Sequence, residues 1–163
     1  MVRTFLIFML AFLCFITSCQ QPAILTESQR AVIRDSVIQL NNRYFDDVKA
    51  NRLGAVLDYI DDSPEFFWVF PPDTTVISHD ALVAMFKTEV RLYRSIDLVW
   101  DYMRVEPLTN QYAVYTGKFH ETKIDISNRV TKFNGAETGI VVHRPTGWKF
   151  LNGQTFEVSQ KND

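Results

Sequence analysis

Residues 43–62 read RYFDDVKANRLGAVLDYIDD, and they contain the end of one helix pattern and nearly all of a second. Before this stretch, apolar side chains recur every three or four positions, which is the spacing of one face of an α-helix. Thr26, followed three residues later by a glutamine, has the capping-box pattern of a helix start. The sequence therefore predicts a long amphipathic helix over about 27–49 and a short second helix beginning near Asn51.

The short helix is expected to end at 61–64 (DDSP), because the residue before a proline avoids the helical conformation. Residues 65–70 (EFFWVF) have the pattern of an aromatic strand, and a short strand is predicted at 75–77. Ser78 is a favoured N-cap residue, and apolar residues at helical spacing follow it. We therefore predict a third helix at about 79–93.

From Ser95 onward the apolar residues alternate with a period of two, which indicates extended strands. A turn at 127–129 is preferred over the competing Asn134-Gly135 turn signal, because it separates two strands of matched length and leaves the glycine as a bulge. The predicted strands are 96–103, 112–126, 130–144 and 148–158. Helices followed by long strands predict an α+β fold, with three N-terminal helices packed on one face of a curved antiparallel sheet.

The order of these elements and two stretches of sequence resemble the nuclear transport factor 2-like (SnoaL-like) superfamily. Residues 43–62 resemble its opening, in which a long and a short helix lead into an aromatic first strand. Residues 147–156 (GWKFLNGQTF) resemble its closing strand. The resemblance covers about 27–158. It implies a cone-shaped domain in which the concave sheet and the first helix enclose a pocket, often in a homodimer.

The first 18 residues have the pattern of a signal peptide. Arg3 is followed by an apolar run at 5–15, which is too short to span a hydrocarbon core of about 30 Å. Residues 16–19 (ITSC) resemble a bacterial lipobox, which implies cleavage before Cys19 and a lipid on its sulfur. An ordinary secretory signal with an accidental cysteine is the alternative. Gln20 resembles an outer-membrane sorting pattern, so we predict a lipid-anchored protein of the bacterial cell envelope, on the outer membrane.

The predicted organisation is a signal peptide at 1–18, a tether at 19–26, one domain at 27–158 and a tail at 159–163. The chain of 163 residues carries a net charge of −2, and its scattered basic residues form no stripe of the kind that binds nucleic acid. One of its two cysteines lies in the signal peptide and the other takes the lipid. The processed chain is therefore expected to have no thiol catalysis, disulfide or cysteine metal ligand.

The implied pocket has several candidate ligand-binding residues. Alternation along the last strand places Asn152 and Gln154 on the same face as Trp148 and Phe150. Amide groups among aromatic rings are typical of a mostly apolar cleft with a few directed polar groups. The alternative is that the two amides lie on a solvated face at the end of the strand. The candidates for ligand binding are Tyr44, Trp68, Trp100, Trp148, Asn152 and Gln154.

The resemblance to steroid isomerases of the superfamily implies that Tyr44 is an oxyanion donor, although a buried tyrosine with a satisfied hydroxyl is the alternative. Two other features of this pocket speak against catalysis. At the position where those enzymes hold their carboxylate base stands Trp68, and an indole cannot abstract a proton. The amides of Asn152 and Gln154 do not titrate near neutral pH.

The histidines offer only a weak catalytic alternative. His79, His120 and His143 have no metal-ligand spacing, so we predict no metal, and we predict no cofactor. His120 could form an acid–base pair with Glu121 or Glu137 if both face inward, although pairing across strands at the surface is expected.

The sequence therefore favours a membrane-anchored, non-catalytic module that binds a small apolar or aromatic ligand or a protein partner. The alternative is a small enzyme of the isomerase, dehydratase or cyclase type that uses Tyr44 and His120 in the pocket. A structural domain whose own aromatic residues fill the pocket is the third possibility. An ionisable residue with a perturbed pKa that points into the cavity would favour the enzyme.

Overall fold

The computed structural model describes residues 24–50, 53–71 and 75–158. The predicted signal peptide, Cys19, most of the predicted tether, the C-terminal tail and Asn51 lie outside these residues. Among the described residues, no helix is long and apolar enough to cross a membrane. The elements in chain order are α2 (Glu27–Lys49), α3 (Leu53–Val56), η1 (Leu57–Tyr59), β1 (Phe67–Val69), β2 (Val76–Ile77), α4 (His79–Leu92), β3 (Tyr93–Pro107), β4 (Tyr112–Asp125), β5 (Val130–Arg144) and β6 (Gly147–Glu157).

The three predicted helical segments are present, with boundaries close to those expected. α2 begins at a full capping box, in which the Thr26 hydroxyl accepts a hydrogen bond from the backbone N–H of Gln29. The side chain of Gln29 in turn accepts from the backbone N–H of Thr26. The Ser78 hydroxyl caps α4 by accepting from the backbone N–H of Ala81. Local capping therefore determines where both long helices begin.

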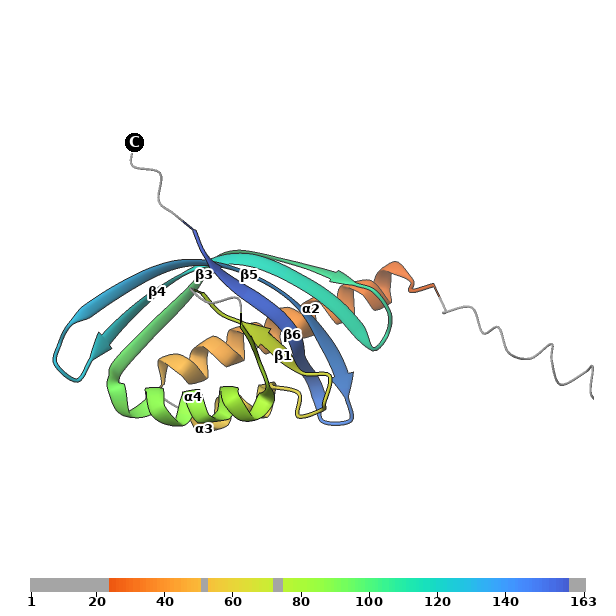
Figure 1. Ribbon diagram of the computed structural model, residues 1–163. Coiled ribbons are helices and arrows are strands. Elements are labelled where there is room, and N and C mark those ends of the chain that lie inside the picture. Colours follow the sequence, from red (N-terminus) through yellow and green to blue (C-terminus); the bar gives the residue numbers. More distant parts are fainter. Residues whose placement is uncertain (1–23, 51–52, 72–74, 159–163) are drawn as a thin grey trace, which may run out of the picture.

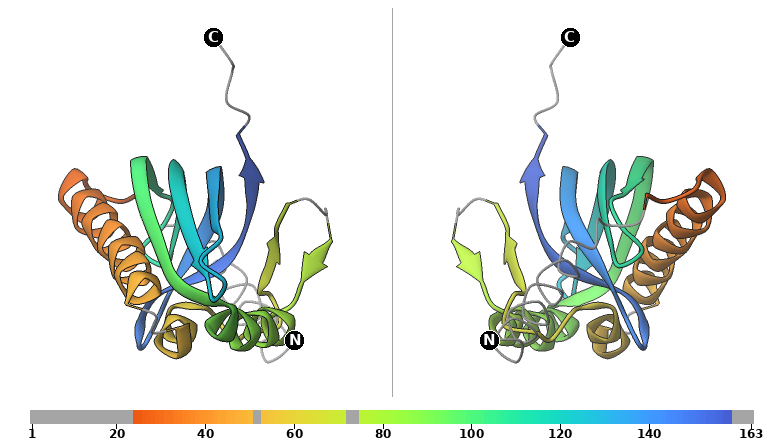
Figure 2. Two further views of the ribbon diagram at one scale, coloured as in Figure 1. Left: turned by 90° about the vertical axis from the view of Figure 1, so that its left-hand side faces the viewer. Right: turned by 90° about the vertical axis from the view of Figure 1, so that its right-hand side faces the viewer.

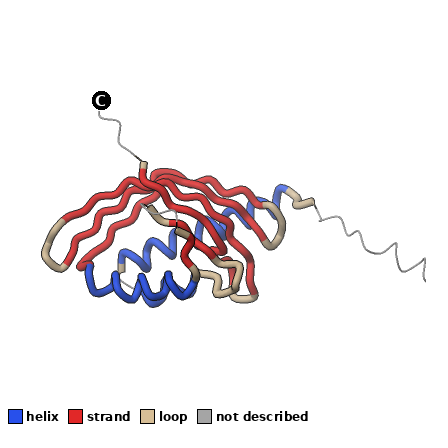
Figure 3. The backbone as a smooth tube through the Cα atoms, in the orientation of Figure 1, coloured by secondary structure: helices blue, strands red, loops and turns tan. Residues whose placement is uncertain are grey.

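The strands form one curved sheet in the order β2-β1-β6-β5-β4-β3. The sheet arches over α2 and α4 (Figure 1), and the helices all lie on its concave side (Figure 3). The turned views show α2 next to β3, with α4 near the foot of the short strands β1 and β2 (Figure 2). This is the cone-shaped α+β arrangement predicted from the sequence.

One strand pairing differs from the antiparallel sheet that was expected. β1 runs parallel to β6, with Trp68 opposite Gly153, whereas the other pairs are antiparallel. The direction of β1 is set by the residues before it, because the backbone N–H of Asp61 donates to the carbonyl of Phe150. Ile60 forms a parallel bridge with the same residue. The chain thus already runs alongside β6 before β1 begins.

The turn between β4 and β5 lies where the sequence placed it. Oδ1 of Asp125 accepts from two backbone N–H groups of the turn, at 2.8 and 2.9 Å, and Asn128 has a φ of 65°. Gly135 pairs regularly with Phe119, so the bulge expected at this glycine does not occur. A Cβ at Gly135 would overlap the Phe119 ring, and the glycine therefore serves packing rather than a turn.

Three bulges interrupt the ladders at other positions. Two lie in β3, one between Tyr93 and Ser95 and one just after Trp100. The third lies in β6, where Leu151 has no partner in β5 and is left between Phe150 and Asn152, which are both paired. A bulge bends its strand and increases the local twist, so these positions help to make the face toward the helices concave.

α2 supplies much of the core beneath the sheet. Its side chains Val37 and Leu40 are fully buried. The Phe45 ring stacks on Trp100, with centroids 4.8 Å apart and planes inclined by 5°. Burial of each such side chain contributes about 1.5–3 kcal/mol. This packing holds α2 against β3.

Candidate functional site

A cavity of about 370 Å³ lies between α2, α4 and the concave face of the sheet. Its volume is at the smaller end of the range for small-molecule sites. Its wall includes the rings of Tyr44, Phe45, Phe86, Tyr93, Phe119 and Phe133 and the charged groups of Glu89, Glu121, Lys123 and Glu137. A void of about 30 Å³, with room for about two water molecules, shares Tyr44, Phe70, Phe86 and Glu137 with it.

The central polar group of this cavity is the carboxyl of Glu137, on β5. Its Oε1 accepts a hydrogen bond of 2.6 Å from the hydroxyl of Tyr115, and its Oε2 accepts one of 3.1 Å from Thr155. The indole N–H of Trp68 donates to the Thr155 hydroxyl at 3.1 Å. These contacts form a hydrogen-bond chain from β1 through β6 to the carboxyl.

Two glycines make room for this chain. Gly139 and Gly153 face each other across β5 and β6. A Cβ on Gly139 would lie 3.0 Å from the Tyr115 ring, and one on Gly153 would lie 2.9 Å from the Trp68 ring. The absence of side chains at these two positions therefore leaves room for the rings of Tyr115 and Trp68.

Burial is the main influence on the Glu137 carboxyl. It raises the pKa of Glu137 to about 7, although the hydrogen bonds from Tyr115 and Thr155 act in the opposite direction. A carboxyl with this pKa is present in both protonation states near neutral pH. It can therefore accept a proton and return it, which is what a general base requires.

Tyr44 brings a second polar group to the cavity from α2. Its ring packs edge-on against Phe150, with centroids 5.3 Å apart. Burial, followed by the nearby carboxylates of Glu137, Glu89 and Glu121, raises the pKa of Tyr44 far above its ordinary value. No described residue forms a hydrogen bond with its hydroxyl, which is therefore a protonated donor available to a ligand.

The remaining charges form a cluster at the edge of the cavity, which we call the rim cluster: Glu89, Glu121 and Lys123. The Lys123 ammonium lies 3.2 Å from Glu121, 3.7 Å from Glu89 and 5.2 Å from the centroid of the Tyr93 ring. Burial raises the pKa of Glu121. Burial alone would lower the pKa of Lys123, but the two carboxylates more than offset it, so the lysine stays charged.

The structure places two of the ligand-binding candidates at this site. Tyr44 lines both the cavity and the small void, and Trp68 lines the void. Trp100 is packed under the sheet against Phe45, and Trp148 lies beside His143, with centroids 5.1 Å apart. Neither of these two tryptophans is part of the cavity wall.

Asn152 and Gln154 do not share a face with Phe150, and that part of the prediction is wrong. The unpaired Leu151 shifts the alternation of β6 by one residue. As a result Phe150 faces the cavity side, whereas Asn152 and Gln154 line a shallow groove on the convex side. Thr155 takes the inward position, opposite Glu137.

His120 also lies outside the cavity, so its predicted alternative role beside Tyr44 is wrong. Its neighbour Phe119 points inward, and the imidazole points to the convex side. There its Nδ1 lies 2.8 Å from Oδ1 of Asp101, and both side chains are about half exposed. This is the surface pairing across strands that the sequence favoured.

The sequence indicated Glu137 only as a partner for His120, but its pattern also contained a signal that Glu137 is buried. The inward positions of β5 run through Phe133, Gly135, Glu137, Gly139 and Val141. A single acid flanked by glycines on an otherwise apolar face indicates a buried carboxyl. The contributions of the rim cluster and of Tyr115 depend on distant elements, and no local pattern signals them.

No metal site is evident in the described part of the chain. Within 24–50, 53–71 and 75–158, no three histidine, cysteine, aspartate or glutamate side chains are placed to hold a metal ion.

The helices on a concave sheet, with a cavity between them, define the nuclear transport factor 2-like fold. No family model and no curated protein matches the sequence. A protein provisionally named scytalone dehydratase, from Novosphingobium aromaticivorans, matches with a TM-score of 0.75 at 11% identity, over 82% of this chain and 89% of its own. A nuclear transport factor 2-like superfamily protein from Salmonella enterica matches with a TM-score of 0.67 at 15% identity, over 81% and 95%. The hexachlorocyclohexane dehydrochlorinase LinA-type3 from Novosphingobium barchaimii matches with a TM-score of 0.65 at 12% identity, over 85% and 97%.

Proposed function

We propose that this protein is a small enzyme that removes a proton from an apolar or aromatic substrate, in an elimination or an isomerisation. The observation that carries the proposal is the Glu137 carboxyl, which lines the cavity with a pKa of about 7. Structural neighbours named as a dehydratase and a dehydrochlorinase support the reaction class, because both names describe eliminations.

Each polar group then has a defined task. Glu137 accepts a proton from a substrate carbon, and the electrons of that C–H bond form either an enolate or a new double bond as a leaving group departs with its bonding pair. The Tyr44 hydroxyl donates a hydrogen bond to the oxygen or leaving group that gains negative charge. Tyr115 and Thr155 hold the carboxyl in place.

Exchange of carbon-bound hydrogen for deuterium tests the base directly. The probe is 2-tetralone in buffered D2O, followed by proton NMR. We expect exchange above the buffer rate, rising with pH to a plateau with an apparent pKa near 7, because only the ionised carboxylate accepts a proton. Glu137→Gln should abolish the enzymatic rate, and Tyr44→Phe should lower it about 10- to 100-fold.

Glu106→Gln is the matched control, since Glu106 is about half exposed, pairs with Arg30 at 2.8 Å and does not line the cavity. Exchange at the buffer rate with wild-type protein would contradict the proposal. So would a rate that is unchanged in Glu137→Gln.

A non-catalytic ligand-binding module is the second candidate. It is favoured by the fact that both oxygens of Glu137 already accept hydrogen bonds, as in carboxyls with a purely structural role. Binding of 2-tetralone without exchange would support this candidate over the enzyme.

We further propose that the chain is anchored to the outer membrane of a bacterium by a lipid on Cys19. The ITSC pattern at 16–19 supports this, together with the apolar run before it. Cells expressing the protein should incorporate labelled palmitate into it, and Cys19→Ala should remain unlabelled and uncleaved. Wild-type protein that takes up no label and fractionates as soluble would refute the anchor.

A further inference from the structure

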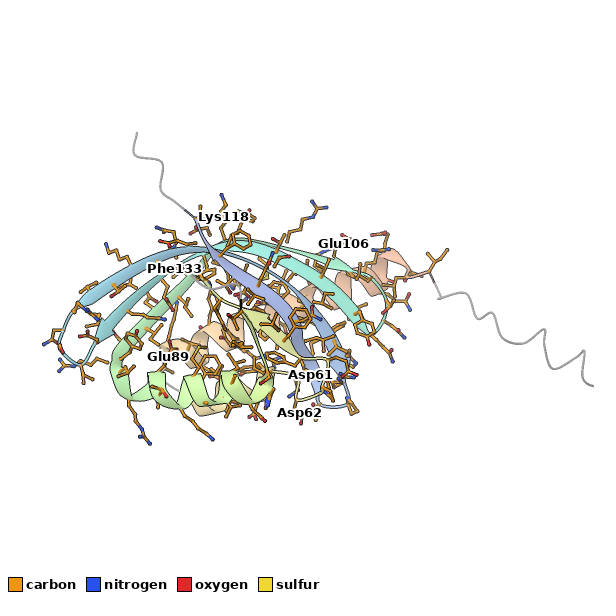
Figure 4. All side chains as sticks on the ribbon, in the orientation of Figure 1. Asp61, Asp62, Glu89, Glu106, Lys118 and Phe133 are labelled. Atoms are coloured by element: carbon orange, nitrogen blue, oxygen red, sulfur yellow. The ribbon has the colours of Figure 1, made fainter. Side chains whose placement is uncertain are left out.

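Negatively charged side chains outnumber positively charged ones on the described wall of the cavity. Among the described residues that line it, three are glutamates and one is a lysine, and none is an arginine or a histidine. Lys123 is shared between Glu89 and Glu121, so the rim cluster keeps a net negative charge. Figure 4 shows Glu89 on α4, on the concave side of the sheet.

Among the described residues, no cation pairs with Glu137. Its described partners are the neutral hydroxyls of Tyr115 and Thr155. Burial raises the pKa of Glu137 and of Glu121, which means that the surroundings compensate neither negative charge fully. A positive charge in the cavity would be attracted to both carboxylates, and an anion would be repelled.

The uncharged part of the wall also suits a cation. An organic ammonium is attracted to the face of an aromatic ring within about 6 Å of its centroid. Lys123 already makes this contact with Tyr93 at 5.2 Å, which shows that an ammonium fits against a ring of this cavity. The rings of Tyr44, Phe119 and Phe133 line the same space.

We propose that the substrate of this cavity is an amine: an aromatic or apolar molecule that carries an ammonium group. This rests on the proposed function, because it concerns the same cavity and the same base. The ammonium lies among the carboxylates, and the apolar part of the molecule contacts the aromatic wall. A positive charge near Glu137 also lowers its pKa, so the bound substrate increases the ionised fraction of its own base at neutral pH.

Three probes with one ring system test the charge preference. They are 2-naphthylmethylamine, 2-naphthylmethanol and 2-naphthoate, titrated by calorimetry into the full chain in lipid nanodiscs, with empty nanodiscs as the blank. We expect the amine to bind at least tenfold more tightly than the alcohol, and the acid to show no binding. Equal affinity for amine and alcohol, absence of amine binding, or preference for the acid overturns the proposal.

The variants Glu89→Gln and Glu121→Gln remove one negative charge each without changing side-chain size. Each should weaken amine binding about tenfold while alcohol binding stays within twofold, and the retained alcohol binding shows that the variant is folded. Glu106→Gln, the matched control outside the cavity, should change neither. Amine affinity that is unaffected in both rim variants also overturns the proposal.

The two proposals fail in different ways. Deuterium exchange that requires Glu137, together with no preference for the amine, leaves the enzyme in place and removes the amine. A clear preference for the amine without any exchange leaves the charge selection in place and removes the enzyme.

Discussion

Replacing Glu137 by glutamine should stabilise the folded protein at alkaline pH. The pKa of Glu137 is about 7 in the folded protein, whereas an ordinary glutamate has 4.5. The folded protein therefore holds this proton more tightly than the unfolded chain does. The free energy of unfolding must then fall as pH rises from about 4.5 through about 7.

The size of this effect follows from the two pKa values. Their difference corresponds to about 3 kcal/mol of destabilisation when the carboxyl is fully ionised. A glutamine cannot ionise, and its carbonyl oxygen can still accept from Tyr115. Its amide group faces Thr155, whose hydroxyl loses an acceptor, at a cost of about 1 kcal/mol. We expect Glu137→Gln to be about 2 kcal/mol more stable than wild type at pH 8 and no more stable at pH 4.

Urea unfolding followed by tryptophan fluorescence measures this at both pH values. Glu106→Gln is the control, because the partly exposed ion pair of Glu106 with Arg30 should contribute about 1 kcal/mol or less at either pH. A Glu137→Gln protein that is less stable than wild type at pH 8 would refute the reasoning. A stability difference that does not change with pH would refute it as well.

Asp61→Ala should lower the free energy of unfolding by about 3 kcal/mol, because it breaks the bidentate pair with Arg144. The neighbouring Asp62 is exposed, and Asp62→Ala, the control, should change the free energy of unfolding in urea by less than about 0.5 kcal/mol. The pair lowers the pKa of Asp61, so its contribution should be present near neutral pH and lost as acid protonates the carboxyl. Gly153→Ala should lower the melting temperature, because its Cβ would lie 2.6 Å from a backbone oxygen of the adjacent strand; Gly54→Ala, with nothing within 4 Å, is the control. The domain should sediment as a dimer, since the convex groove lined by Asn152 and Gln154 also contains the exposed ring of Phe67, and a persistent monomer at high concentration would contradict this.

The helices were predictable because their signals are local. Thr26 and Ser78 both cap helices where the sequence indicated, and apolar spacing decides the rest. The turn at 127–129 was predictable because a turn at this position gives β4 and β5 nearly equal lengths. The parallel position of β1 was not, since it depends on contacts with the far end of the chain.

The candidate site was predicted only in part. Tyr44 was found because it lies on the apolar face of a clearly periodic helix. Asn152 and Gln154 were misplaced because a rule of strict alternation contains no information about where a residue is left unpaired. Glu137 needed knowledge of which face of β5 is concave, and that is decided by strands and helices far away in sequence.

The unpaired Leu151 affects the curvature of the sheet without affecting which residues of β6 face Glu137. Asn152 lies opposite Ile140, directly beside the pair of Phe150 and Val141. Deletion of the single codon for Leu151 would therefore restore an unbroken ladder and still leave Thr155 facing Glu137. What would change is the bend of the sheet. A relative that lacks this residue should align to the chain only with a gap of one position, and should carry a shallower cavity with the same inward-facing groups.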